Sequence, residues 1–141
     1  MTVMPEPQQR LSRSAEDYLE AIGHLCQQRR VAQVSDIAEM LGVQKPSVTA
    51  AMRRLAELGL IEYRPYAPIQ LTEKGKQYAD KVSRAHGILH RFMHEVAGLS
   101  EQRADESACL MEHILTFEEI EGMARRLDGL RAAGFLPGDS V

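Results

Sequence analysis

Three residues in the C-terminal part of the sequence carry side chains that commonly bind metal ions. Cys109, Glu112 and His113 are spaced at i, i+3 and i+4, so a helix would bring a thiol, a carboxylate and an imidazole onto one face. These groups are donors for divalent first-row metals. Thiolate is a soft ligand and carboxylate a hard one, so the combination influences which ion is bound. An alternative stays open at this point, because cysteine is often a small buried hydrophobe and Glu-His is a common dipeptide. A metal site therefore requires further donors.

The first predicted helix supplies one further pair of donors. Asp17 and Glu20 are three residues apart and lie at the margin of an apolar face formed by Tyr18, Leu19 and Ile22. Two carboxylates in this position could share a metal ion. The alternative is that both face solvent in the first helical turn, where the positive helix end favours carboxylates.

Imidazole and further carboxylate donors lie between these two segments. Histidines spaced by about one helical turn are ligands in many metal sites and ordinary surface residues in others. Carboxylates one turn before Cys109 would add oxygen donors to the same helix face. The residues concerned are His86, His90, His94, Asp105 and Glu106.

An enzyme is not predicted. Cys109 and His113 match a nucleophile and a base only in composition, because one helix face offers neither an evident oxyanion hole nor a third orienting group. The His-Glu-x-x-His motif of hydrolytic zinc sites is absent from the sequence.

The elements that must position these residues are mainly α-helical. A first helix is predicted at about 14–29. Ser35 is the expected N-cap of a short helix that stops at Gly42, and Pro46 begins a longer helix that ends at Gly59. The alternating segments 60–64 and 69–72, separated by two prolines, predict a β-hairpin. Three more helices are expected, from about 72 to 98, from Ser100, and from Thr116 through 130.

A short helix, a glycine turn, a longer helix and a hairpin form the order of a winged helix-turn-helix, which predicts binding to double-stranded DNA. Apolar residues should hold the two helices together; they are Ile37, Ala38, Leu41, Val43, Val48 and Met52. The expected DNA contacts are Ser35, Gln44, Lys45, Pro46, Ser47, Thr49, Arg53 and the wing residue Arg64, with Arg54 able to neutralise a phosphate. The alternative is an ordinary solvated charged face. Tyr63 and Tyr66 could touch DNA or pack on their own helices.

Composition limits the other possibilities. The 141 residues carry a net charge of -3, so DNA binding must use a local basic cluster. Two distant cysteines without a signal peptide favour a reduced, cytoplasmic protein, and no apolar run is long enough for a membrane span. We expect a flexible arm at 1–13, a winged helix-turn-helix domain at 14–73 and a helical metal-binding and dimerisation domain at 74–141.

The order of these motifs resembles the diphtheria toxin repressor family of metal-dependent transcriptional regulators, especially its short branch of manganese transport regulators. The resemblance covers nearly the whole chain. It rests on Ser14-Ala-Glu-Asp-Tyr-Leu-Glu20, Val34-Ser-Asp-Ile-Ala38, Pro46-Ser-Val-Thr49, Leu71-Thr-Glu-Lys-Gly75, Ala85-His86 and Cys109-Leu-Met-Glu-His113. The resemblance implies a winged helix joined to a helical dimerisation domain, without the SH3-like domain of longer members.

The resemblance also implies a ligand set. Asp17 and Glu20 match first-helix carboxylates of the manganese branch, whereas His86, Glu112 and His113 match donors shared across the family. Cys109 departs from the manganese branch, which usually has a glutamate there, and matches the iron-responsive branch. The site is thus a hybrid for Mn(II) or Fe(II), with Zn(II) or Co(II) as substitutes in vitro and one or two ions per subunit. His90, Asp105 and Glu106 lie near an ancillary site of the iron branch.

The expected function is a homodimeric repressor that binds a palindromic operator when loaded with metal and controls metal homeostasis genes. Apolar residues expected to pair or to fill the core are Leu89, Met93, Val96, Ile114, Leu115 and Ile120. The alternative is a winged-helix repressor that senses redox state or a small organic ligand through Cys109. An interaction module that does not bind DNA is the third possibility.

Overall fold

The computed structural model describes residues 10–29 and 31–136 of the chain, so most of the predicted N-terminal arm, residues 1–9, lies outside the described residues. The chain divides into two compact units, Met1–Lys76 and Gln77–Val141. Among the described residues, no helix is both long and apolar enough to cross a membrane.

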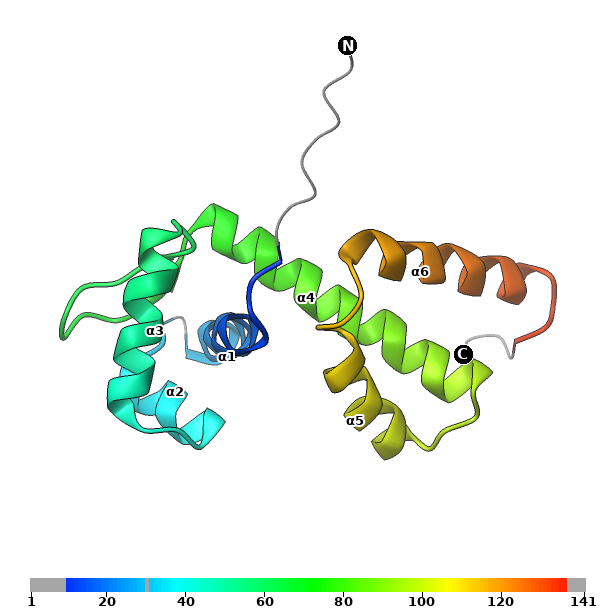
Figure 1. Cartoon of the computed structure of the whole chain (residues 1–141), viewed down its shortest axis with the longest axis horizontal. Coiled ribbons are helices and arrows are strands. Elements are labelled where there is room, and N and C mark those ends of the chain that lie inside the picture. Colours follow the sequence, from blue (N-terminus) through cyan, green and yellow to red (C-terminus); the bar gives the residue numbers. More distant parts are fainter. Residues whose placement is uncertain (1–9, 30, 137–141) are drawn as a thin grey trace, which may run out of the picture. The chain divides into compact units, whose positions relative to one another are not determined.

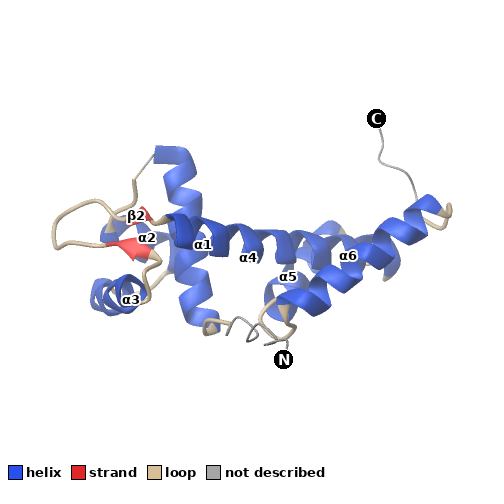
Figure 2. Ribbon diagram, turned by 90° about the horizontal axis from the view of Figure 1, so that it is seen from above, coloured by secondary structure: helices blue, strands red, loops and turns tan. Residues whose placement is uncertain are grey.

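The first unit is a winged helix-turn-helix, as the sequence predicts. It contains α1 (Arg13–Arg29), α2 (Val34–Leu41), α3 (Lys45–Glu57), β1 (Ile61–Glu62) and β2 (Gln70–Leu71). The two strands form an antiparallel hairpin (Figure 2). Ile61 lies opposite Leu71, and an isolated bridge joins Ala32 to Ile69. Figure 1 shows α2 beside α3, with the hairpin following α3.

The start of α2 differs from the sequence prediction. Gln33, and not Ser35, is the N-cap, and the Asp36 carboxylate accepts a hydrogen bond of 3.3 Å from the Gln33 backbone N–H. Asp36 can close this contact because it stands three residues after the cap, which starts the helix earlier than expected. Gly42 ends the helix with φ of 65°, a left-handed conformation that glycine adopts at low cost.

The core of the first unit joins its three helices to the hairpin. Leu19 and Ile22 of α1 are fully buried together with Ile37, Val48, Met52, Leu55 and Ile69. The prediction of Val43 as an interior residue is wrong, since 37% of its surface is exposed. Its backbone N–H closes the end of α2 by donating to the Ala38 carbonyl, which turns the chain outward.

A buried ion pair fixes the beginning of α1. Glu16 lies in the first turn of α1 and has no exposed surface. Arg10 donates from Nη2 to Glu16 Oε1 at 2.6 Å and from Nε to Oε2 at 3.1 Å. This bidentate pairing compensates the charge that the helix buries.

The turn from α3 into β1 is held against the start of α4 (Glu73–Arg91). Thr72 donates from its backbone N–H to the Leu60 carbonyl at 3.1 Å and from its hydroxyl to the Gly59 carbonyl at 2.6 Å. A Cβ atom at Gly75 would lie 1.9 Å from the Leu60 carbonyl oxygen, so only glycine permits this approach. The hairpin is therefore anchored at its base by backbone contacts.

The second unit is helical and packs around the later part of α4 (Figures 1 and 2). A short π-helix, η1 (Phe92–Val96), follows α4, and α5 (Glu101–Met111) and α6 (Phe117–Ala132) complete the unit. Ser100 caps α5 and Thr116 caps α6, as predicted. The core contains Ala85, Ile88, Leu89, Ala108, Ile120, Ala124 and Leu127.

Of the apolar residues expected either to pair subunits or to fill the core, two belong to that core. Leu89 and Ile120 are 0% and 1% exposed, so they fill the interior of the unit. Val96 and Ile114 are 42% and 78% exposed. Hydrophobic spacing predicts an apolar helix face, but only the tertiary contacts decide which part of that face is covered.

Candidate metal centre and nucleic-acid interface

The three donors near the end of α5 differ in exposure. Glu112 is the C-cap of α5 and is 2% exposed, whereas Cys109 in the last turn is exposed. The side chain of His113 is 7% exposed, and its Nε2 lies 3.3 Å from Glu112 Oε1. The carboxylate and one imidazole therefore face the interior, and the thiol lies at the surface.

His86 of α4 connects these residues. Its Nδ1 lies 2.8 Å from Glu112 Oε2 and 3.8 Å from Cys109 Sγ, while its Nε2 lies 2.8 Å from Asp105 Oδ1. The hydrogen bond to Glu112 raises the pKa of His86 to about 9; burial opposes this shift and Asp105 adds to it. In the metal-free protein, an imidazolium at this position balances the buried Glu112 charge.

Asp105 was noted in the sequence as a further oxygen donor but was not included in the predicted ligand set. It stands four residues before Cys109 on α5, which places both side chains on one helix face. One ligand atom from each of His86, Asp105 and Cys109 lies within 4.8 Å of the others. The i, i+4 spacing is the signal that could have added Asp105.

The donors in this cluster fit a divalent transition metal. Together they provide imidazole nitrogen, carboxylate oxygen and thiol sulfur, a mixture suited to Mn(II), Fe(II), Co(II) or Zn(II) rather than to Ca(II) or Mg(II). Glu112 is a buried carboxylate between two imidazoles, so the site requires a positive charge, which a proton or a metal ion would supply.

The other predicted donors lie in several places. Asp17 and Glu20 are half-buried on α1 and belong to the first unit. His90 and Glu106 do not join Asp105: His90 faces Glu101 at 3.1 Å, and Arg103 donates to Glu106 at 2.7 Å. The three residues compared with an ancillary site thus have separate partners.

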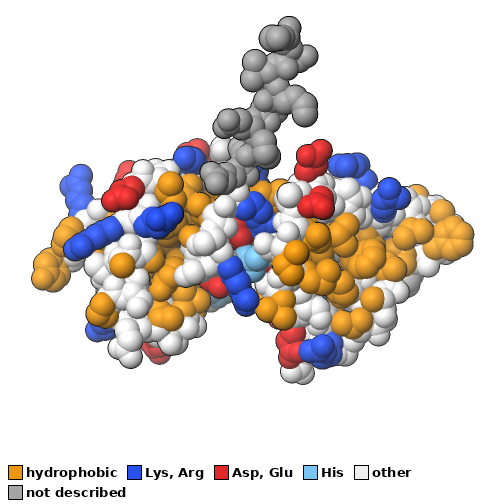
Figure 3. Space-filling view, in the orientation of Figure 1, with side chains coloured by type: hydrophobic (Ala, Val, Ile, Leu, Met, Phe, Trp, Pro, Cys, Tyr) orange, Lys and Arg blue, Asp and Glu red, His pale blue; other side chains and the backbone are white. Residues whose placement is uncertain are grey.

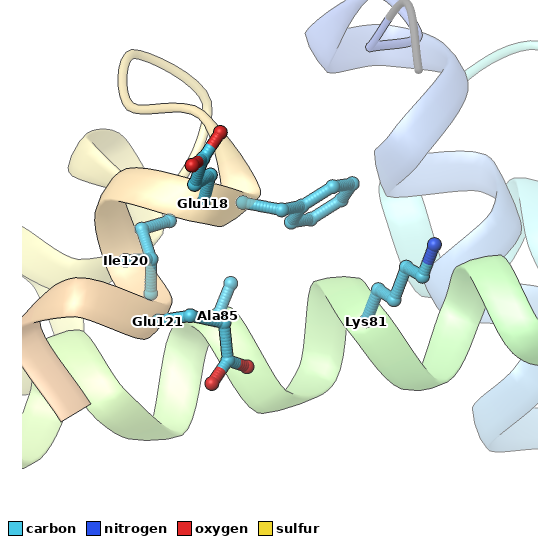
Figure 4. A pocket seen from close by; sticks show the side chains of 6 residues that line it. Lys81, Ala85, Glu118, Ile120 and Glu121 are labelled. Atoms are coloured by element: carbon cyan, nitrogen blue, oxygen red, sulfur yellow. The ribbon is translucent and has the colours of Figure 1, made fainter. Parts of the chain in front are cut away.

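A small pocket of about 160 Å³ between α4 and α6 does not gather donors (Figure 4). Its two carboxylates belong to Glu118 and Glu121, and in Figure 4 they point in opposite directions. Glu121 is paired with Arg84 of α4. Among the pocket residues, the chemistry therefore favours packing over metal binding.

A groove of about 600 Å³ lies on the first unit between the start of α2, the start of α3 and the hairpin. Four predicted DNA contacts line it: Ser35, Lys45, Thr49 and Arg53. Four others, Gln44, Pro46, Ser47 and Arg64, are exposed outside its lining. Figure 3 shows Lys and Arg side chains projecting from the end of this unit that carries α3 and the hairpin.

The wing residues Tyr63 and Tyr66 also line the groove. Tyr63 is half-buried, whereas Tyr66 is fully exposed and adopts a φ of 64°, which is uncommon for a residue with a side chain. An exposed aromatic ring at a hairpin tip is positioned to contact a partner rather than its own helices. Basic, hydroxyl and aromatic groups together suit a nucleic-acid surface.

Comparison with known families matches both units of the chain. Residues 10–69 match the family described as iron dependent repressor, N-terminal DNA binding domain. Residues 72–132 match the iron dependent repressor, metal binding and dimerisation domain. The matched ranges contain the groove of the first unit and the donor cluster of the second.

Individual relatives agree with these matches. The chain is 38% identical over 112 residues to an uncharacterized HTH-type transcriptional regulator of Methanocaldococcus jannaschii, covering 79% of this chain and 90% of that relative. It is similar to IdeR of T. acidophilum (28% identity, TM-score 0.70, 85% of this chain and 55% of that chain). A manganese-dependent transcriptional repressor in complex with manganese is also similar (25% identity, TM-score 0.71, 86% and 53%). The chain spans about half the length of these two solved structures.

Proposed function

The chain belongs to the iron-dependent repressor family of metal-dependent transcriptional regulators, and from this premise we propose that it represses metal homeostasis genes by binding a palindromic operator when loaded with Mn(II) or Fe(II). The observation that carries the proposal is the position of Glu112. This buried carboxylate lies between His86 and His113, with Cys109 beside His86, in the matched metal-binding domain.

His86, Cys109, Glu112 and His113 are the proposed ligands of the second unit, and Asp17 with Glu20 are those of the first. A bound divalent ion would supply concentrated positive charge to these donors. Glu112 and His86 hold their positions through a 2.8 Å contact, which limits the reorganisation that binding requires. Asp105 contacts the other ring nitrogen of His86, Nε2, at 2.8 Å and so orients the ring.

DNA recognition is assigned to the groove of the first unit. Lys45 and Thr49 at the start of α3 are proposed to reach base edges in the major groove, and Arg53 to neutralise a phosphate. Arg64 and Tyr66 of the hairpin are proposed to contact the sugar-phosphate backbone of the DNA beside that major groove. The groove lies between α3, the proposed recognition helix, and the hairpin, the proposed wing.

A homodimer is proposed because two symmetric half-sites require two recognition helices. The second unit carries exposed apolar side chains that a partner subunit would cover; they include Leu110, Ile114, Leu130 and Phe135. Figure 3 shows hydrophobic side chains gathered over this unit. The matched family domain is itself a dimerisation domain.

The test is DNA binding under anaerobic conditions with controlled metal. A duplex selected from a random library in the presence of Mn(II) serves as the ligand, and its affinity is measured by fluorescence anisotropy with EDTA, Mn(II), Fe(II) or Zn(II). We expect tight binding with metal and loss of binding with EDTA. A DNA affinity that EDTA does not change but that is lost after mild peroxide treatment would contradict this proposal. That result would support the alternative, a repressor that senses redox state through Cys109.

A further inference from the structure

The buried ion pair between Arg10 and Glu16 adjoins the proposed metal donors of the first unit. Glu16 is the residue directly before Asp17 and stands one helical turn before Glu20. The Glu16 side chain is 1% exposed and that of Arg10 is 15% exposed, so the pair is shielded from solvent. Arg10 precedes the first residue of α1, so the charge of Glu16 is neutralised from outside the helix.

The first turn of α1 has few backbone contacts to hold it closed. The first N–H groups of a helix have no carbonyl partner within it, and helix ends open more easily than helix centres. Ser12 supplies two local contacts: its Oγ accepts from Ala15 N–H at 3.2 Å, and its carbonyl accepts from Glu16 N–H at 3.0 Å. Ser12 is itself exposed. Asp17 follows this turn directly, so the position of its carboxylate depends on whether the turn stays closed.

Arg10 adds a side-chain contact that fastens this turn. Its Nη2 and Nε donate to the two carboxylate oxygens of Glu16 at 2.6 and 3.1 Å, and such a bidentate pair fixes orientation as well as distance. Glu16 and Leu19 are both fully buried and three residues apart, so they belong to one inward face of α1. Without Arg10, Glu16 would be a buried charge with its cation removed, and opening the first turn would expose it to water.

We propose that Arg10 is a positioning residue for metal binding: its pair with Glu16 holds the first turn of α1 closed and so keeps the Asp17 carboxylate in place for the ion. This inference rests on the proposed function, in which Asp17 and Glu20 are ligands. Glu20 depends less on Arg10, because it lies about one turn further into the helix, beyond the end that frays. Replacing a residue that orients a ligand typically costs about 10–100-fold in metal affinity.

The test is a double-mutant cycle on the Mn(II) affinity of the full-length chain, measured anaerobically by electron paramagnetic resonance of the free ion. Arg10→Met should lower this affinity by about tenfold, and Arg10→Lys, which keeps the charge but not the two parallel donors, by less. In an Asp17→Asn background Arg10→Met should have little further effect, whereas in a Glu20→Gln background its effect should remain. Arg13→Met removes an exposed arginine from the same turn and is the matched control, with unchanged affinity.

Hydrogen exchange of the metal-free chain provides a second readout that needs no ion. Arg10→Lys is used here because it destabilises the fold less than Arg10→Met. It should speed exchange of the Asp17 amide more than exchange of the Leu25 amide, which lies deeper in α1. Arg13→Met should leave both exchange rates unchanged.

Three results would overturn the proposal. The first is a wild-type Mn(II) affinity in Arg10→Met and Arg10→Lys. The second is an equal loss of affinity from Arg10→Met with and without Asp17→Asn, because the ion pair would then act only through general stability. The third is a wild-type affinity in Asp17→Asn alone, which would also remove Asp17 from the ligands of the proposed function. In the first two results Asp17→Asn still weakens binding, so the proposed function survives them.

Discussion

Two glycines of α4 should respond in opposite ways to the same substitution. At Gly75 a Cβ would lie 1.9 Å from the Leu60 carbonyl oxygen and 2.9 Å from its carbonyl carbon, whereas at Gly87 nothing lies within 4 Å. Real Cβ atoms essentially never approach closer than 3.0 Å, so Gly75→Ala must separate α4 from the turn before β1 by about 1 Å. That movement would strain the hydrogen bond from Thr72 N–H to the Leu60 carbonyl, now 3.1 Å long.

The magnitudes follow from these contacts. Overpacking against backbone costs about 1–3 kcal/mol, and a strained hydrogen bond adds about 1 kcal/mol, so Gly75→Ala should destabilise the first unit by about 2–3 kcal/mol after its helix-propensity gain. Gly87→Ala should stabilise its helix by about 0.5–1 kcal/mol. Because Gly75 anchors the base of the hairpin, Gly75→Ala should also weaken DNA binding.

The assay is thermal unfolding followed by circular dichroism, with hydrogen exchange to assign the change to a unit. Gly75→Ala should lower the unfolding temperature by roughly 8–24 °C, because each kcal/mol lost shifts the unfolding temperature of a domain of this size by about 4–8 °C. Gly87→Ala should raise it. If Gly75→Ala is as stable as wild type, or if both variants lose stability equally, the proposed close approach of α4 to Leu60 is refuted.

Three further predictions concern charged groups. Arg10→Met should destabilise the first unit by about 3 kcal/mol in urea unfolding, because the Glu16 charge stays buried after its Arg10 partner is removed. Adding Glu16→Gln should recover part of this loss. A double variant that recovers no stability would contradict the pairing. The pKa of His86 is raised from 6.5 to about 9, so its ion pair with Glu112 should stabilise the metal-free second unit fully below pH 6.5. This stabilisation should be lost as the pH rises through 9. Equal free energies of unfolding below pH 6.5 and above pH 9 would count against this ion pair. Lys45→Ala and Arg53→Ala should each weaken DNA binding. Because Arg53 is proposed to contact a phosphate, Arg53→Ala should also reduce the slope of log affinity against log salt concentration by about one. An unchanged slope and affinity would exclude that contact.

The order of the helices could be read from the sequence because their ends carry local signals. Gly42 ends α2, and Ser100 and Thr116 cap α5 and α6, each through contacts within a few residues. The start of α2 was misplaced because two polar residues, Gln33 and Ser35, could each act as cap. The π-turn after α4 has no such local signature and was not predicted.

The candidate site could be predicted only in part, because its geometry depends on how helices pack. Their spacing places Cys109 and Glu112 on one helix face. It does not decide that Glu112 is buried and Cys109 is exposed. The rotation of α5 against α4 decides that Asp105 meets His86 while Glu101 meets His90. The pairing of Arg10 with Glu16 likewise arises in an irregular segment, where periodicity carries no information.

The central claim is that metal held by the cluster around Glu112 controls DNA affinity, and thermodynamic linkage tests it most directly. The affinity of the selected duplex is measured with and without Mn(II) or Fe(II), and the affinity of the same ion is measured with and without the duplex. We predict that each ligand tightens the other by the same factor, about tenfold or more, and that Glu112→Gln reduces this factor toward one. A DNA affinity that stays the same after complete removal of metal would contradict the claim.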